Sequence, residues 1–383
     1  MFLISFLISV VVAAPTDLLS IGFNIETVIK VRANLLQIAT HSWEIGTALE
    51  SLTELEWLSL SVFSNTFPPP THLGLLNNAT DVRSIATQIV QAKPADSLPF
   101  LDGDGAVGDP ASVGVAVLLA NWTRPDLLDT SISQAAAGQL QYLLQDAPRT
   151  PDGAISQRVD QVQLWADFVY MAPPFIAYYG ALQGGDYGSN LLQVAYDQCR
   201  LYRQYLRDDG GLWRHITLGT GQDSSHWGTG NGWAAAGMLR VLETIRLSQS
   251  PFQFVEQQAN LTSWIQEIVS AAWSFQKPNG TLYNYIDDDT SFADSSSTAL
   301  LASVTFRIAA LTGDFTYIPA ANRALSVIES SVNADGWLLN TVDPETFNTP
   351  SQPGSYSPEG QAFVLLLQAA HRDLLKLLFL TRA

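Results

Sequence analysis

The sequence predicts an all-α protein, built as a closed toroid of six helical hairpins. Two observations predict this fold class. Helical periodicity dominates the chain, and the alternation typical of strands between hairpin turns is scarce. An Asp-Gly, Asn-Gly or Gly-Gly turn also recurs, and each one precedes a polar loop and a helix rich in small residues. These turns stand at 102–103, 152–153, 210–211, 279–280 and 335–336.

The spacing of the turns is roughly 50 to 70 residues, which fits two helices at about 1.5 Å rise per residue plus their connections. Small residues at the helix starts let the helices crowd around a common axis, with the polar loops gathered at one mouth. An open helical solenoid is the alternative arrangement.

Six segments have the apolar spacing of helices of three or more turns. They are 133–145, 190–206, 234–247, 261–275, 298–311 and 360–380. Several of them are apolar nearly all round, for example LLASVTFRIAALTG, and this pattern is typical of helices buried on both sides.

Composition and charge limit the classes of partner. The chain of 383 residues is 47% hydrophobic, enough for a large core, and we expect one domain over residues 15–383 because no linker divides it. Nineteen basic and 36 acidic residues give a net charge of -17. This balance argues against nucleic acid and against anionic membrane surfaces as partners. We expect a monomer.

The N-terminus predicts export. Residues 2–14 (FLISFLISVVVAA) are apolar and uncharged, too short to span a bilayer, and placed like a secretory signal peptide over residues 1–14. Sequons at Asn78, Asn121, Asn260 and Asn279 agree with a secreted, extracellular glycoprotein.

No cofactor or metal is expected. Cys199 is the single cysteine and lies in a helical pattern, so we predict a small core residue. The run 287–289 (DDD) lacks the alternating ligands of a calcium loop, and five histidines without close spacing do not suggest a zinc site.

Asp167 is the strongest candidate for a catalytic residue. It is the only charged residue between Asp160 and Asp186, within the apolar, aromatic run QLWADFVYMAPPFIAYYG. A carboxyl group in such surroundings must be paired or must hold its proton, and a held proton suits a general acid. The alternative is an aspartate that caps a helix or bonds to the backbone of a turn.

A second candidate segment is HWGTGNGW, residues 226–233. Trp227 and Trp233 offer stacking faces for a sugar ring, and His226 offers a polar partner. The stretch lacks the pattern of a phosphate-binding loop. The alternative is a glycine-rich turn closed by two core tryptophans.

Together with GGLWRHI and DSSSTALLAS, these two segments resemble the unsaturated glycuronyl hydrolases of glycoside hydrolase families 105 and 88, in the six-hairpin glycosidase superfamily. The resemblance covers about residues 102–370. It implies an (α/α)6 barrel, in agreement with the repeat. It also implies removal of a terminal 4,5-unsaturated uronic acid from lyase-generated oligosaccharides of pectin or rhamnogalacturonan, by protonation at C4 and addition of water at C5.

The resemblance also implies roles for single residues. Asp167 matches the proton donor, and His215 matches a histidine near the substrate, although a loop histidine bonded to backbone is the alternative. Trp227 and Trp233 match tryptophans that line the pocket. Asp109 matches a second aspartate near the sugar, or else it is a helix N-cap before a proline. We expect Asn231 to hold the loop rather than to touch substrate.

One position departs from the family pattern. Many members carry an arginine where this chain has Thr229, and that arginine is a candidate partner for the uronate carboxylate. With Thr229 facing the substrate, either Arg214, Arg158 or His226 takes over the charge, or the substrate differs.

Two alternatives to the unsaturated uronide hydrolase remain open. The same barrel and acid can act on a saturated or differently decorated glycoside. The protein can also be a non-catalytic glycan-binding barrel that lost its activity with the arginine. A desolvated carboxyl at Asp167 favours an enzyme, since a binder gains little from it.

Overall fold

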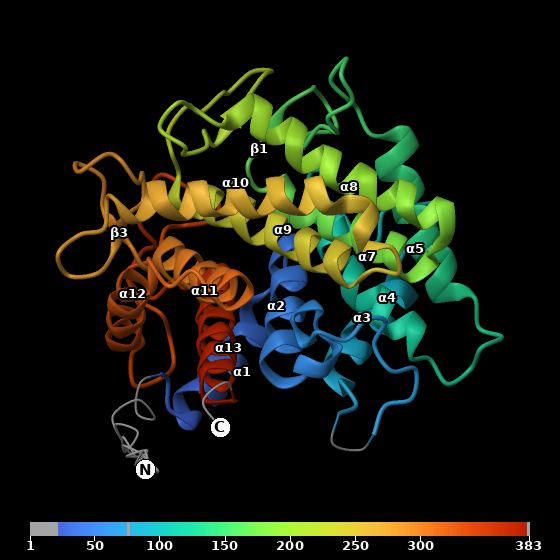
Figure 1. The fold of residues 1–383 in the computed structure, drawn as a ribbon, viewed down its shortest axis with the longest axis horizontal. Helices are drawn as coiled ribbons and strands as arrows, with labels where there is room; N and C mark the ends of the chain where they lie inside the picture. Colours follow the sequence, from blue (N-terminus) through green and yellow to red (C-terminus); the bar gives the residue numbers. More distant parts are fainter. Residues whose placement is uncertain (1–21, 75–76, 381–383) are drawn as a thin grey trace, which may run out of the picture.

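A computed structural model of the chain describes residues 22–74 and 77–380 (Figure 1). The expected signal peptide, residues 1–14, lies outside the described residues. The helices are α1 Ile25–Ile38, α2 Ser42–Glu56, α3 Thr80–Ala92, α4 Gly114–Trp122, α5 Ser131–Gln141, α6 Phe168–Met171, α7 Pro173–Gln183, α8 Gly185–Leu206, α9 Gly228–Leu247, α10 Val255–Trp273, α11 Ser295–Thr312, α12 Ile318–Ser331 and α13 Pro358–Leu380.

Four strands of two residues each and a few short helical turns complete the described part of the chain. The strands are β1 Leu164–Trp165, β2 Ile216–Thr217, β3 Leu282–Tyr283 and β4 Ala293–Asp294, and they form two antiparallel pairs, β1 with β2 and β3 with β4. The short turns are 3-10 helices at Leu58–Leu60, Val62–Ser64, Asp109–Val113 and Pro251–Phe254, and a π turn at Tyr142–Asp146. The predicted all-α class is confirmed.

The inner helices form a closed ring. Helix α2 contacts α4, and contacts continue from α4 to α7, α9, α11 and α13, until α13 packs against α2. Helices α3, α5, α8, α10 and α12 lie outside this ring, each against an inner helix, and α1 covers α13 (Figure 1). This arrangement is the predicted toroid of six hairpins, and the open solenoid is excluded because the ring closes.

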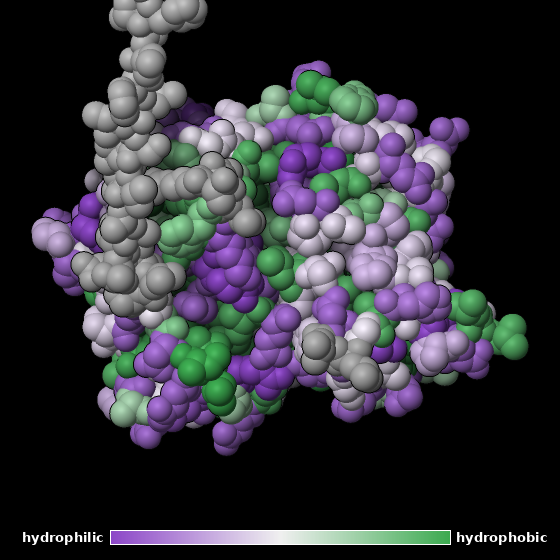
Figure 2. All heavy atoms as spheres, turned by 60° about the horizontal axis from the view of Figure 1, so that its bottom comes forward, coloured by the Kyte–Doolittle hydropathy of each residue, from purple (hydrophilic) through white to green (hydrophobic). Residues whose placement is uncertain are grey.

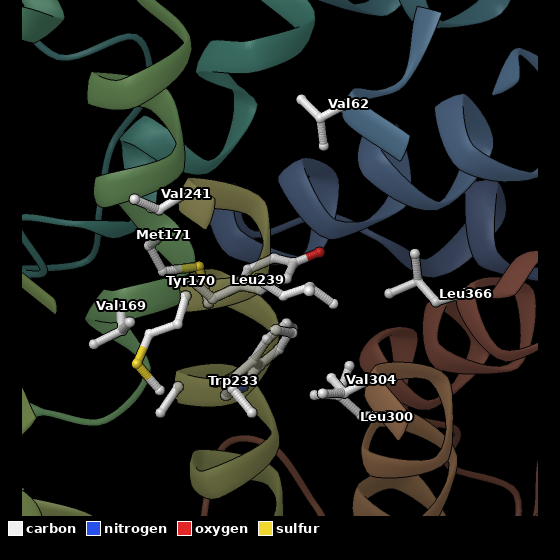
Figure 3. Close-up of a cluster of buried hydrophobic side chains, with 14 of the residues drawn as sticks. Val62, Val169, Tyr170, Met171, Trp233, Leu239, Val241, Leu300, Val304 and Leu366 are labelled. Carbon is white, nitrogen blue, oxygen red and sulfur yellow. The ribbon is translucent and has the colours of Figure 1, made fainter. Parts of the chain in front are cut away.

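The sequence patterns explain which helices lie inside. Helix α11 is buried without interruption from Ser295 to Ala309, as expected of a helix that has neighbours on both sides. The outer helix α8 buries one side only, and Cys199 lies on that side with no exposed surface, as predicted. In Figure 3, Trp233 of α9 lies among Tyr170 of α6 and Leu300 and Val304 of α11, which shows how closely the inner helices meet.

The recurring turns connect each outer helix to the next inner helix. Gly153, Gly211, Gly280 and Gly336 all have φ between +84° and +100°, a backbone conformation that favours glycine. Single β-bridges close three of these turns, at Arg149–Ile155, Arg207–Trp213 and Val332–Leu338. The repeat that was visible in the sequence therefore marks one mouth of the ring.

Helix α9 begins earlier than predicted. It starts at Gly228 rather than at residue 234, so the glycines of HWGTGNGW form its first turn instead of a loop. The glycines allow close approach to α11: a side chain at Gly228 would come within 2.8 Å of Ser297, and one at Gly232 within 2.8 Å of Leu300. Close packing between helices, rather than flexibility, explains these glycines.

The described surface carries mixed polarity. The face in Figure 2 shows hydrophilic and hydrophobic residues side by side, with hydrophilic ones in the larger share. Within residues 22–74 and 77–380, no helix is both long enough and apolar enough to cross a membrane.

Candidate active site

A pocket of about 190 Å³ opens where the loops enter the inner helices. Its lining comes from the start of α2, from the loops that precede α4, α6 and α9, and from the segment that leads into α13. Side chains from residue 43 to residue 359 therefore meet in one cavity. Asp109, Asp167, His215 and Trp227, all predicted from the sequence, line it.

A two-residue ladder holds Asp167 next to His215. Strands β1 and β2 pair antiparallel, with Trp165 opposite Ile216. One residue further, the backbone N–H of Ala166 donates to the carbonyl of His215 at 2.9 Å. Because Asp167 follows Ala166 directly, this short ladder places both side chains at the same point of the pocket.

The Asp167 carboxyl faces His215 and does not cap a helix. Asp167 precedes α6, yet its side chain makes no capping hydrogen bond. Instead, Oδ2 lies 3.5 Å from Nε2 of His215, and the Asp167 side chain is 16% exposed. This distance between the two atoms is too long for a strong hydrogen bond. Neither atom has a hydrogen-bond partner among the described residues, so both can turn to a bound substrate or water.

Asp223 orients His215 from the other side. Its Oδ2 lies 3.0 Å from Nδ1 of the histidine, whose side chain has no exposed surface. Burial alone lowers the pKa of His215, but the carboxylates of Asp167 and Asp223 outweigh it and raise the pKa. Burial alone raises the pKa of Asp223, but His215 and Ser225 lower it to about 2. The two aspartates beside the ring therefore favour the protonated form of His215.

Asp109 lines the pocket and does not act as an N-cap. It is the first residue of the 3-10 helix at Asp109–Val113, where Gly108 holds the cap position. Its Oδ1 accepts a hydrogen bond of 2.7 Å from Nε2 of Gln157. Burial, and to a smaller degree the charge of Asp167, raise the pKa of Asp109 to about 7. The pocket therefore holds a second carboxyl that is partly protonated near neutral pH.

Arg158 brings a guanidinium group to the pocket. Of the three cations that could replace the family's arginine, Arg158 lines the pocket, whereas Arg214 is exposed elsewhere. The Arg158 guanidinium donates to the carbonyl of Asp104 at 3.3 Å and lies 3.7 Å from Asp160. These contacts are long, so the group keeps capacity for another anion.

Aromatic rings surround His215. The Phe347 ring meets it edge-on at 4.6 Å between centroids, and the Trp227 ring lies at 4.6 Å with a tilt of 49°. Trp165 stands edge-on at 5.5 Å. Such walls suit the C–H faces of a sugar ring.

Asn231 fixes the backbone near the pocket, as predicted. Its Oδ1 accepts from the N–H of Trp213 at 2.8 Å, and its Nδ2 donates to the carbonyls of Trp213 and Trp227. This side chain thus ties the segment before His215 to the start of α9.

The structure does not place three of the predicted substrate contacts in the lining of the pocket. Trp233 is fully buried and packs on Tyr170 in the core (Figure 3). Its ring also meets Phe363 edge-on. Thr229 is fully buried in the first turn of α9 and does not line the pocket. The His226 imidazole lies outside the pocket, between Asp287 at 2.7 Å and Asp208 at 2.8 Å. All three lie within residues 226–233. There the chain is part of α9 or, at His226, is held by two aspartates.

The sequence did not single out Gln157, Phe347 and Glu359, which also line the pocket. Gln157 stands next to Arg158 and ten residues before Asp167, so proximity was a usable signal. Glu359 is in the first turn of α13, within the helix start SPEGQAF. Phe347 lies in a loop between α12 and α13 and carries no pattern that indicates its place.

A ring of six helical hairpins, with a carboxyl-lined and aromatic-walled pocket at one mouth, defines a glycoside hydrolase with an (α/α)6 barrel. The profile of Glycosyl Hydrolase Family 88 matches residues 109–368, more than half of the chain. The protein belongs to this family, and the resemblance found in the sequence is confirmed.

Known proteins agree with this assignment. The chain is 26% identical over 252 residues to the unsaturated rhamnogalacturonyl hydrolase YesR of Bacillus subtilis, which covers 63% of this chain and 67% of that protein. A structure from Salmonella enterica serovar Paratyphi A, described as a possible member of the GH105 family, has a TM-score of 0.70 at 17% identity, over 95% of this chain and 98% of that one. The unsaturated glucuronyl hydrolase of Bacillus sp. GL1 has a TM-score of 0.57 at 14% identity, over 91% and 94%. Both structures support the fold.

Proposed function

We propose that the protein removes a terminal 4,5-unsaturated uronic acid from oligosaccharides that polysaccharide lyases release from pectin or rhamnogalacturonan. The observation that carries the proposal is the single pocket shared by Asp167, His215 and Arg158. The acid can protonate the electron-rich double bond of the sugar, and the histidine cation and the guanidinium group can attract its carboxylate. The related YesR protein is named for rhamnogalacturonyl substrates, which fits the same class.

In the proposed reaction, the carboxyl proton of Asp167 goes to C4 of the C4=C5 double bond. A water oxygen adds at C5, and the Asp167 carboxylate takes the proton that this water gives up, which restores the acid. The hemiketal at C5 then opens to a ketone and leaves a hemiacetal at C1. Collapse of the hemiacetal to an aldehyde releases the leaving sugar, so the net change is the addition of one water molecule. The family's scheme thus needs one acid, unlike glycosidases that use two carboxyl groups.

Local charge explains how an anionic sugar can bind to an acidic protein. The net charge of -17 repels anions at a distance. Inside the pocket, Arg158 supplies a permanent positive charge and His215 a second one while it is protonated. The pocket also lies at the N-terminal ends of inner helices, where the partial positive charge of the helix dipole favours anions. We assign the uronate carboxylate to Arg158.

A direct test uses unsaturated digalacturonate from lyase-digested polygalacturonate. We expect the wild-type protein to remove the ultraviolet absorbance of the conjugated double bond while it releases galacturonate. Asp167→Asn should slow this loss by about 100-fold to 10,000-fold, since general acid catalysis typically contributes that much. Asp186→Asn is the matched control, because Asp186 is exposed on α8 and remote from the pocket lining.

Two results would contradict the proposal. Equal rates for the wild type and Asp167→Asn would remove the assigned acid. Release of a saturated sugar with unchanged absorbance would favour an ordinary glycosidase on the same barrel.

We further propose that the protein is secreted and glycosylated. The apolar segment at residues 2–14 and the four sequons support this. Asn279 is exposed, in one of the recurring turns, and is therefore the most accessible acceptor. Expression in a eukaryotic secretory host should yield protein in the medium that loses mass on glycosidase digestion. Intracellular retention of an unmodified full-length chain would contradict it.

A further inference from the structure

Glu359 is a pocket carboxyl to which the reaction above gives no role. It is the second residue of α13, is 3% exposed, and lines the pocket together with Asp167. Its Oε1 accepts a hydrogen bond of 2.9 Å from the indole N–H of Trp43. Its Oε2 is buried and has no hydrogen-bond partner among the described residues. A buried polar atom without a partner is uncommon and calls for a physical explanation.

The surroundings of Glu359 favour its neutral form. Burial raises the pKa of Glu359 well above its ordinary value, and the nearby charges of Glu44, Asp167 and Asp294 raise it further. The hydrogen bond from Trp43 opposes this shift. The partial positive charge at the N-terminus of α13 also opposes the shift, because it favours a carboxylate. No cation forms an ion pair with Glu359 within the described ranges.

The location of the proton follows from the hydrogen bond to Trp43. Oε1 already accepts the indole N–H, so the hydroxyl proton belongs on Oε2. A neutral carboxyl group then presents one O–H donor that finds no acceptor in the protein. Leaving such a donor unpaired in a desolvated site is unfavourable, and an acceptor supplied by a ligand removes this cost.

We propose that Glu359, as a neutral acid, donates a hydrogen bond from Oε2 to an oxygen of the bound uronic acid and so positions the sugar beside Asp167. This inference rests on the proposed function, because it takes the unsaturated uronide as the ligand. The neutral state serves recognition in two ways. It adds a donor where the substrate brings hydroxyl and carboxylate acceptors, and it avoids another negative charge next to an anionic sugar.

Two substitutions separate a neutral donor from a carboxylate. Glu359→Gln keeps an acceptor for Trp43 and offers an amide N–H in place of the hydroxyl, so KM should stay within about threefold of wild type. Glu359→Met has similar length and no donor, so KM for unsaturated digalacturonate should rise about 10-fold to 100-fold. Glu256→Met, at an exposed position on α10, is the matched control.

The pH profile gives a readout that a purely structural role would not move. As pH rises through the ionisation of Glu359, the donor is lost and a negative charge appears, so wild-type kcat/KM should fall. Glu359→Gln cannot ionise and should keep its activity to higher pH. Other titrating groups face this part of the pocket and stay the same in both proteins, so the difference between the two profiles isolates Glu359. These groups are Glu44, Asp109, Asp167, His215 and Asp294.

Binding measurements keep the inference testable apart from turnover. Calorimetry of unsaturated digalacturonate with Asp167→Asn protein should show a Kd that rises about 10-fold to 100-fold when Glu359→Met is added. Equal losses for Glu359→Gln and Glu359→Met would overturn the inference, because a carboxylate would then be required. A lower melting temperature of Glu359→Met with unchanged KM and Kd would also overturn it. A wild-type protein that binds the sugar but leaves its double bond intact would contradict the proposed function instead.

Discussion

Nε2 of His215 lies 3.5 Å from Oδ2 of Asp167, and the opposite nitrogen of the same ring lies 3.0 Å from Asp223. The imidazole is thus held between two aspartates without exposed surface, and these neighbours raise its pKa against the effect of burial. A cation at this point can attract an anionic sugar and can also stabilise Asp167 each time the acid has given up its proton. The geometry therefore connects substrate binding and proton transfer through one ring.

Asp223→Asn should lower the pKa of His215, because Asp223 helps to raise it. The pKa of His215 is raised above 6.5 in the folded protein, so this contribution to stability is present below about pH 6.5 and is lost as pH rises through the folded pKa. We expect the variant to lose about 1–3 kcal/mol of unfolding free energy at mildly acidic pH and less at alkaline pH. Denaturant titrations at several pH values, with NMR titration of the imidazole, measure both effects. An unchanged His215 titration midpoint would rule out the assigned coupling.

Arg158→Met should impair binding of the uronate. Loss of the guanidinium removes a charge-assisted contact, so KM should rise about 10-fold to 100-fold while kcat changes less. Arg214→Met is the matched control, because Arg214 is exposed and does not line the pocket. Steady-state kinetics on unsaturated digalacturonate provide the comparison. If both variants behave like wild type, another group binds the carboxylate.

Trp227 and Trp233, six residues apart, should respond differently to replacement by phenylalanine. Trp233→Phe should lower the unfolding free energy by about 1–3 kcal/mol and leave KM unchanged, because the ring belongs to the core. Trp227→Phe shortens a pocket wall and also removes the indole hydrogen bond of 3.1 Å to Asn284, so KM should rise about tenfold. Thermal melts and kinetics on both variants check this. A raised KM for Trp233→Phe would place that ring near the substrate after all.

Asp109→Asn should remove a pH-dependent cost to stability. Burial raises the pKa of Asp109 from 3.8 to about 7, so the folded state binds a proton that the unfolded state has released. The contribution of Asp109 to the free energy of unfolding is therefore largest below about pH 4. It falls by roughly 4 kcal/mol at most as pH rises towards 7. Asp109→Asn should gain stability relative to wild type at neutral pH but not at pH 4. Glu50, whose burial also raises its pKa to about 7, contributes equally to both proteins. Parallel pH dependences would contradict the shift at Asp109.

The fold was predictable where polar and apolar residues follow the helix period. The apolar run that became α11 and the glycine turns before the inner helices gave the architecture without a structure. Helix α2 was not singled out, because it buries Glu44 and Glu54 among apolar residues. Glu54 pairs with Arg240 and Arg307 from other helices of the ring. A buried charge that depends on distant partners cannot be recognised from its own segment.

The site was predictable where chemistry is local to a motif. Asp167 and Trp227 line the pocket as expected, whereas Trp233 does not. Since α9 begins at Gly228, six residues turn the chain by about 240° around the helix axis, and Trp233 is directed into the core instead of the pocket. Phe347 and Glu359 reach the pocket only because the ring closes. No sequence pattern near these two residues indicates that closure.

Closure of the ring also affects folding during synthesis, because α1 packs against α13, which is made much later. The N–H of Phe23, just before α1, bonds to Gln368 of α13 across 345 residues of sequence. At a synthesis rate of about 5–20 residues per second, α1 waits roughly 20 to 70 seconds for this partner to emerge. During that interval the apolar stripe of α1, with Val28, Val31 and Leu35, lacks the neighbour that later covers it. Until α13 has been synthesised, this stripe is exposed apolar surface of the kind that chaperones bind.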